Sequence, residues 1–327
     1  MLRIYFTAED VARTRIADGP DPLWELGLSM QMLRPQRGDA LFGAWRREAW
    51  RAVRQGHSGQ IIDLLLALNP NVGYFPDFLN PIQAAHGLEH GLETIRATGI
   101  TALVHDIGKL ATARRLPDGV RRLAAGEPRM LIELTTAMRT CHDVMVKPYR
   151  RSIDTAVGHD RRRRVDALTS GGVEGMLAGL RPMMRWSHGE LSIPSHRDQE
   201  LHLGGRGLLL IPSYFCVSGP LTMFNPSLPP VLVYPVERGA DALPGLPTCP
   251  PRGLKALIGP NRTIVLQELH NGHATTTQLA YRAGISPASA SEHAKILREA
   301  GLITSRRDRN RVIHDLTPLG LALLLGR

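Results

Sequence analysis

One short motif in the first half of the chain has the residue types of a hydrolytic metal site. His105 and Asp106 stand side by side in the run His-Asp-Ile-Gly-Lys, within a segment whose periodicity predicts a helix. A metal ion held by such a pair and by further ligands could activate a water molecule for attack on a phosphate ester. The available further ligands are His86 or His90 before the motif and Asp143, Asp154 or Asp160 after it.

This arrangement would make the protein an HD-type metal-dependent phosphohydrolase, and we retain that function as an alternative. The upstream His of such a site normally lies on its own helix at a larger separation, and the sequence has no second His-rich ligand segment. We therefore interpret His105 and Asp106 as a surface pair near a helix end. We expect no catalytic residues and no enzyme activity.

A second group of polar residues, near the C-terminus, has the chemistry of DNA recognition. Four arginines crowd into Arg306–Arg311, a polar tip between two apolar β-type runs, and such a hairpin tip suits contact with phosphates or the minor groove. Before it, short polar side chains open a predicted helix and could reach base edges in the major groove, although Ser291 and His293 could instead contact phosphates. The predicted DNA-binding residues are Thr275, Thr276, Thr277, Ser286, Pro287, Ala288, Ser289, Ser291, Glu292, His293, Lys295, Arg306, Arg307, Arg309, Asn310 and Arg311.

The elements that must position these residues follow from caps and apolar spacing. A first helix ends at Asn271-Gly272, and Thr275 to Thr277 offer N-caps for a second helix over 276–283. Gly284 allows a tight turn, and Ser286 caps a third helix that begins at Pro287 and ends before Gly301. Two β-runs and a short last helix to Leu325 complete the segment.

Small residues predict how the second and third helices meet. Ala290, Ala294 and Leu297 form an inner stripe on the third helix, opposite Ala280 and Ala283 on the second. Small side chains let two helices cross closely, so the polar residues of the third helix are left to face outward. We therefore expect that helix to be free to enter a major groove.

This order of motifs resembles the winged-helix regulators of the arsenical-resistance repressor (ArsR) type. The resemblance is carried by Thr277 to Ala280, Gly284 to Ser286 and Ser289 to Ile303, within about a fifth of the chain. It implies that the third helix lies in the major groove, that the hairpin is the wing, and that the protein is a sequence-specific transcriptional regulator of double-stranded DNA. A winged helix kept only for contacts with other proteins is the alternative.

Two departures from the family shape the expectations. Its metal-sensing members carry a Cys-x-Cys-type ligand set on the helix before the recognition helix, or His and Asp ligands on the last helix; neither is present here, so we expect no metal and no cofactor. Many members dimerise through a long final helix, whereas this chain ends at Arg327. We therefore expect the N-terminal domain to form the homodimer, which would bind an inverted repeat.

The sequence pattern of the N-terminal region predicts an α+β protein that is mostly helical. Helical periodicity covers most of residues 7–168, with one helix expected to run through Val11 to Ile16 and another over 81–98. Short β-type runs then predict a small antiparallel sheet around residues 183–235, with a hairpin turn at Ser187-His188-Gly189. The predicted domains are 1–240, a linker over 241–252, and the winged helix-turn-helix over 253–327.

The N-terminal domain is also where we expect a small-molecule effector. It resembles, loosely, an uncharacterised domain fused to such winged helices in high-GC bacteria, and that resemblance brings no ligand with it. The candidate effector-binding residues are Tyr74, Phe75 and Phe78, which share a Pro/Gly/Asn-rich loop. The alternative is that the three rings are ordinary core.

The charge distribution agrees with a DNA-binding C-terminal segment. The chain has a net charge of +10, and 36 of its 40 basic residues are arginine. Residues 252–327 hold 11 Lys/Arg and 5 Asp/Glu, a net charge of +6, so the last quarter of the chain carries more than half of the excess. The run Arg161–Arg164 is interpreted as a solvated helix face.

The three cysteines and the lengths of the apolar runs indicate where in the cell the protein works. Cys141, Cys216 and Cys249 have no ligand or redox spacing, so we expect small buried apolar residues in a reducing cytoplasm. The N-terminus lacks the pattern of a secretory signal. No apolar run is long enough to span a bilayer, so we expect a cytoplasmic protein without membrane association.

Overall fold

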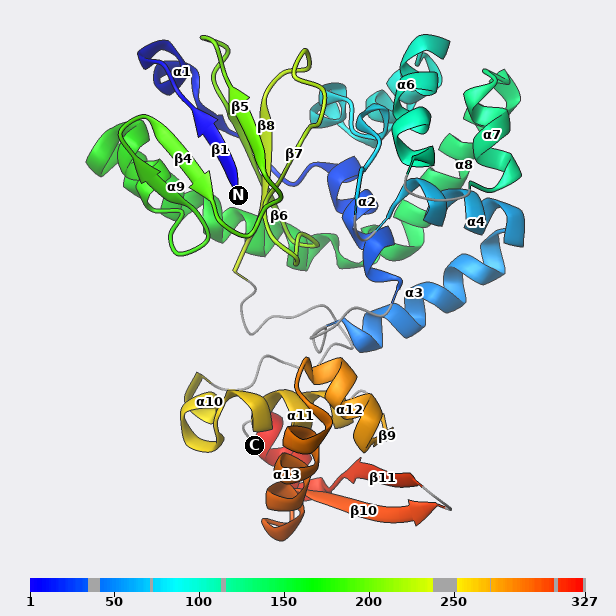
Figure 1. The fold of residues 1–327 in the computed structure, drawn as a ribbon, viewed down its shortest axis with the longest axis vertical. Coiled ribbons are helices and arrows are strands. Elements are labelled where there is room, and N and C mark those ends of the chain that lie inside the picture. The colour runs from blue at the N-terminus through cyan, green and yellow to red at the C-terminus, as the bar shows by residue number, and fades with distance from the viewer. Residues whose placement is uncertain are drawn as a thin grey trace. The chain divides into compact units, whose positions relative to one another are not determined.

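The computed structural model describes residues 1–34, 42–70, 73–112, 116–237, 252–270, 272–308 and 311–325 (Figure 1). Its packing divides the chain into two compact units, and the mixed α+β class predicted from the sequence is confirmed. The first unit consists of residues 1–31 and 52–237, and the second of residues 32–51 and 238–327. The boundaries predicted for the domains stay predictions; linker residues 241–251 and Cys249 lie outside the described residues.

Helices make up most of the first unit. Those that lie mainly in it are α1 (Ala8–Arg13), α2 (Pro22–Met32), α4 (Gly59–Leu68), η1 (Asp77–Leu79), η2 (Ile82–His86), α5 (Leu88–Arg96), α6 (Ile100–Ala111), α7 (Asp118–Ala124), α8 (Pro128–Met145), η3 (Lys147–Tyr149) and α9 (Arg150–Ala178). The single helix predicted over 81–98 is wrong: Gly87, at φ 122°, separates η2 from α5. A positive φ of this size is readily adopted only by glycine, so the helix breaks there.

The first helix shows both a confirmed cap and a corrected end. Thr7 Oγ1 accepts a hydrogen bond from the Asp10 amide at 3.2 Å, and Asp10 Oδ2 accepts one from the Thr7 amide at 2.9 Å, which is the predicted capping box. The helix does not continue to Ile16. Thr14 is extended, and residues 15–16 form strand β2 instead. Pairing with β6 satisfies their backbone groups there, so the sheet competes successfully with the helix.

Two four-stranded mixed sheets replace the single antiparallel sheet predicted around residues 183–235. One has the order β3 (Arg185–Ser187), β4 (Glu190–Ile193), β1 (Leu2–Tyr5), β5 (Gln199–His202), and the other the order β2 (Arg15–Ile16), β6 (Leu209–Ser213), β8 (Val231–Pro235), β7 (Leu221–Thr222). The pairs β1–β5, β2–β6 and β6–β8 are parallel. The prediction missed them because both N-terminal strands enter the sheets from far away in the sequence. The hairpin turn is confirmed, with His188 and Gly189 at positive φ between β3 and β4.

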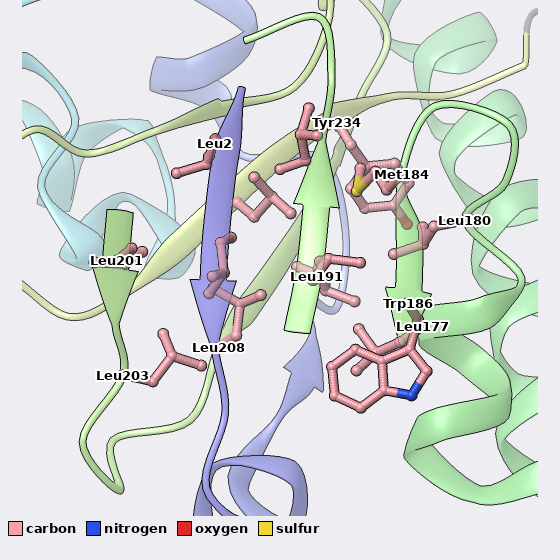
Figure 2. Packing of buried hydrophobic residues seen from close by; sticks show 14 of the residues in the cluster. Leu2, Leu177, Leu180, Met184, Trp186, Leu191, Leu201, Leu203, Leu208 and Tyr234 are labelled. Carbon is pink, nitrogen blue, oxygen red and sulfur yellow. The ribbon is translucent and has the colours of Figure 1, made fainter. Parts of the chain in front are cut away.

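The core between these strands and the end of α9 is built from leucines. Figure 2 shows Leu2 on β1 with Leu191 and Leu201, which come from its two neighbouring strands. Leu177 of α9 and Tyr234 of β8 belong to the same buried cluster. Buried and half-buried residues alternate along β1 and β4 because successive side chains of a strand point to opposite faces of the sheet, and one of those faces packs on this core.

Two buried carboxylates connect the N-terminal residues of this unit to distant segments. Asp10 is fully buried and accepts a hydrogen bond from the Gly207 amide at 2.8 Å. Glu25, on α2, accepts hydrogen bonds from the Tyr214 and Phe215 amides at 2.7 and 3.0 Å. Backbone amides just before and just after strand β6 are thus satisfied by side chains almost two hundred residues away, as burial requires.

The arginine run on α9 is not the solvated face that the sequence suggested. Arg164 is buried, forms an ion pair with Asp160 at 3.0 Å and donates a hydrogen bond to the Gly179 carbonyl at 2.6 Å. Asp160 also accepts a 2.5 Å hydrogen bond from the Tyr234 hydroxyl. The interpretation holds for Arg162, which is exposed, and fails for Arg164, because a carboxylate four residues earlier lets the guanidinium be buried.

The second unit contains a compact helical domain with a three-stranded sheet. Its elements are α10 (Arg252–Ile258), α11 (Pro260–His270), β9 (Ala274–Thr275), α12 (Thr276–Ala283), α13 (Pro287–Glu299), β10 (Ile303–Asp308), β11 (Arg311–Leu316) and α14 (Pro318–Leu325), with strand order β10-β11-β9. Among the described helices none is both long and apolar enough to cross a membrane.

Residues 32–51 are grouped with this second unit, which the sequence did not suggest. They include the first nine residues of α3 (Gly43–Gly56), where Trp45 is fully buried. Glu268 of α11 is also buried, and burial raises the pKa of its carboxyl to about 7, against the opposing charges of Arg282 and Arg46. The second unit therefore contains a buried titratable carboxyl as well as an apolar core.

The N-cap of α2 makes the stability of the first unit pH-dependent. Asp21 Oδ1 accepts hydrogen bonds from the Leu23 and Trp24 amides, both at 3.0 Å, yet burial raises the pKa of this carboxyl to about 6. The folded state then binds the proton more tightly than the unfolded chain, whose aspartates titrate near 4. The contribution of Asp21 to the free energy of unfolding should therefore fall by about 3 kcal/mol as pH rises from about 4 to 6.

Asp21→Asn should remove that fall, because an amide oxygen still accepts both hydrogen bonds and does not titrate. The measurement is urea unfolding of both proteins at several values between pH 4 and 7. The wild-type stability should decline relative to the variant across this window and run parallel to it above pH 6. Parallel curves throughout would show that the carboxyl titrates normally.

Candidate nucleic-acid interface

The corner between α12 and α13 has the caps that the sequence predicted. Thr275 is the N-cap of α12: its hydroxyl accepts a hydrogen bond from the Gln278 amide at 3.3 Å, and Gln278 Oε1 accepts one from the Thr275 amide at 2.9 Å. Gly284 ends α12 in the left-handed conformation, at φ 69°. Ser286 then caps α13 by accepting a hydrogen bond from the Ser289 amide at 3.1 Å, with Pro287 at the first helical position.

The inner stripe of α13 is also confirmed. Ala290, Ala294 and Leu297 are at most 1% exposed, and Ala280 and Ala283 of α12 belong to the same core. A methyl group is the largest side chain at four of these five positions, so the two helices can pack closely. The burial of this stripe directs the other side of α13 toward solvent.

The outward side of α13 presents most of the predicted contact residues. Ser286, Pro287, Ala288, Ser291, Glu292 and Lys295 are exposed. Two others are only half-exposed. Ser289 shares a hydrogen bond with the Ser286 hydroxyl at 2.9 Å, and His293 has its Nδ1 atom buried without a partner in the structure. Among Ser289, Ser291 and His293, Ser291 is therefore the most accessible to base edges.

The wing forms as a two-stranded hairpin whose described tip residues are exposed. Strands β10 and β11 pair in antiparallel register from Ile303↔Leu316 to Asp308↔Arg311. Arg306, Arg307 and Arg311 extend into solvent, although Arg306 lies 3.9 Å from Asp315. Arg309 and Asn310, also predicted to bind DNA, lie outside the described residues. Three arginines among the described residues thus lie close together on the hairpin, one of them near a carboxylate.

The three predicted threonine contacts have different surroundings. Thr277 is exposed, as a contact residue must be, and Thr275 is largely occupied by its capping role. Thr276 points elsewhere: its hydroxyl lies 2.9 Å from Nε2 of His314. We missed His314 at the sequence level. The available signal was a lone histidine at a strand position that alternation would bury, within a hairpin rich in exposed polar residues.

The residues of the alternative hydrolytic site do not come together. Asp106 is buried and accepts a hydrogen bond from the Phe78 amide at 2.9 Å, while His105 Nδ1 lies 3.1 Å from its other oxygen. The candidate third ligands are in ion pairs: Asp143 with Lys147, Asp154 with Arg150, and Asp160 with Arg163 and Arg164. Within the described part of the chain, no three His, Cys, Asp or Glu residues lie close enough together to hold a metal ion.

Comparison with known proteins matches this domain to bacterial regulators. Residues 259–305 match the model of the family described as bacterial regulatory protein, arsR family. Over 72 residues the chain is 32% identical to the HTH-type transcriptional regulator NmtR of Mycobacterium tuberculosis, which is 22% of this chain and 60% of that protein. Over 75 residues it is 32% identical to the HTH-type transcriptional regulator Rv2034 of the same organism, which is 23% of this chain and 70% of that protein. The chain thus spans three fifths of the length of the first relative.

The close approach of α12 and α13 can be tested by enlarging one residue of the stripe. Ala290→Leu should destabilise the second unit by about 1 to 3 kcal/mol, because the added side chain has no space between the helices. Ala288→Leu, two residues earlier and on the exposed side of α13, should change the stability by less than about 0.5 kcal/mol. Both are measured by chemical unfolding of the full chain. Equal effects at the two positions would show that the stripe is not tightly packed.

Proposed function

The chain belongs to the arsR family of bacterial regulatory proteins through its C-terminal domain, and we propose that the whole protein is a transcriptional regulator that binds double-stranded DNA through α13 and the wing. The observation that carries the proposal is the arrangement of α13, whose apolar stripe is buried while its polar side is exposed beside an arginine-bearing hairpin. A helix of this kind fits a major groove, and a basic hairpin fits the neighbouring backbone.

We further propose that the protein acts as a homodimer on an inverted repeat, and that it has no catalytic activity and needs no metal. In a two-fold symmetric complex the two α13 helices would lie about 34 Å apart, one turn of DNA. The first unit, which the family match does not cover, is the proposed dimerisation domain. A regulator that works only through other proteins is the alternative; it predicts no affinity for duplex DNA at any salt concentration.

The wing and α13 should contribute differently to DNA binding. Arg307→Ala removes a phosphate contact, so it should weaken binding to all duplexes about equally and lower the salt slope of the binding constant by about one unit. Ser291→Ala removes a hydroxyl that faces base edges, so it should cost about 1 to 3 kcal/mol on a duplex enriched by selection and much less on random sequence. The measurement is the affinity of each full-length variant for both duplexes across a salt series.

Arg151→Ala provides the matched control, because Arg151 is an exposed arginine on α9 of the other unit. Its removal should leave the salt slope unchanged if the second unit alone contacts DNA. If Arg307→Ala relaxes specificity and Ser291→Ala weakens all duplexes equally, the two roles are reversed. If Arg151→Ala lowers the slope as much as Arg307→Ala does, charge anywhere on the molecule is sufficient.

An effector site in the first unit is the remaining part of the proposal. Of the three aromatic candidates, Phe75 lines a cavity together with Met30, Met138 and Asn80, whereas Tyr74 and Phe78 do not line it. Asn80 is 3% exposed, and neither polar atom of its side chain has a hydrogen-bond partner among the described residues. The cavity itself is about 10 Å³, room for about one water molecule, so an effector must displace its flexible methionine walls.

Asn80→Leu tests whether this amide serves a ligand. The free energy of unfolding of the ligand-free chain should rise by about 1 to 3 kcal/mol in this variant. The substitution replaces an unpaired buried amide with an apolar side chain of similar size. It should also abolish retention of any small molecule that mass spectrometry detects in the purified wild-type protein. A loss of stability on substitution would show that the amide already has its partners, and the cavity would then not be the effector site.

A further inference from the structure

A buried histidine connects the wing to the helix-turn-helix. His314 lies on β11, the central strand of the small sheet, and is 3% exposed. Its Nδ1 atom is 2.7 Å from the Ser305 hydroxyl on β10, and its Nε2 atom is 2.9 Å from the Thr276 hydroxyl in the first turn of α12. One ring therefore spans three elements that are separate in sequence.

The two hydroxyls suit a neutral ring. A neutral imidazole has one donor and one acceptor nitrogen, and a hydroxyl can serve either of them. Burial lowers the pKa of His314, and the positive charge of Arg298 lowers it further, against a smaller opposing effect of Asp315. The ring is thus neutral near pH 7, with both nitrogens hydrogen-bonded and no buried charge to compensate.

The strand that leads into α12 pairs with the wing over a short ladder. Strand β9, which leads into α12, pairs with β11 at two positions only, Ile313↔Thr275 and His314↔Ala274. The hairpin beyond them extends to Asp308 and Arg311. Ile303 and Leu316 pack on the domain core and fix the base of the hairpin. The His314 side chain, which bridges β10, β11 and α12 just beyond that base, restricts tilting of the part that extends into solvent.

We propose that His314, through Thr276 and Ser305, is a positioning residue that holds the wing at a fixed orientation to α13, so that both bind the same stretch of DNA together. The proposal rests on the proposed DNA-binding function. Once α13 is in the groove, a fixed wing meets its phosphates at high effective concentration, whereas a loosely held wing loses much of that advantage. Thr276 then acts on DNA binding without touching DNA.

Thr276→Val tests this role, because valine keeps the shape of threonine and removes only the hydroxyl. In the full-length protein, binding to a random-sequence duplex should weaken and the salt slope should fall toward that of Arg307→Ala. The double variant Thr276→Val, Arg307→Ala should bind the duplex with nearly the same affinity as whichever single variant binds it less tightly, because both changes remove the same wing contact. Thr304→Val is the control, since Thr304 is an exposed hydroxyl on β10 that faces away from His314.

A second measurement does not depend on DNA. In Thr276→Val and in Ser305→Ala, amide hydrogens of the wing should exchange faster with solvent than in the wild-type protein, while those of α13 keep their protection. Multiplicative losses of affinity in the double variant, or unchanged exchange in the wing, would overturn the positioning role and leave DNA binding standing. If the wild-type protein binds no duplex DNA, but the two variants still exchange the amide hydrogens of the wing faster than it does, the proposed function is overturned and the positioning role remains.

Discussion

The contact between α12 and α13 is the constraint on which the recognition surface depends. Ala280 and Ala283 on one helix meet Ala290 and Ala294 on the other, and only small side chains allow this approach. The contact fixes the rotation of α13 about its axis. That rotation alone decides which residues reach solvent, so the apolar packing of the domain and its recognition chemistry are set by the same four residues.

In the first unit, buried carboxylates perform a comparable organising task. The sheets are assembled from strands at opposite ends of the unit, and their turns leave backbone amides inside the protein. Asp10 and Glu25 accept those hydrogen bonds, while Asp160 satisfies Arg164 and Tyr234. Polar side chains thus hold together sheets whose strands are distant in sequence, which apolar burial alone would specify poorly because it is not directional.

The sequence predicted the helices and the hairpin of the C-terminal part of the second unit well because their signals are local. Caps at Thr275 and Ser286, the glycine turn and the apolar spacing all lie within a few residues of the feature they determine. The parallel pairs of β1 and β2 could not be predicted, since they depend on partners almost two hundred residues away. The same limit applies to the site: the exposure of Ser291 followed from periodicity, whereas the engagement of Thr276 by His314 required the fold.

The exposed side of α13 has a consequence for how such a protein diversifies. Ala288, Ser291 and Glu292 are exposed and have no side-chain hydrogen bond or ion pair within the described residues, while the caps and the alanine stripe do the folding. Substitutions at these three positions therefore cost little stability. Under the proposed function, descendants of one ancestral gene can therefore change the DNA sequence they prefer while the scaffold is inherited intact.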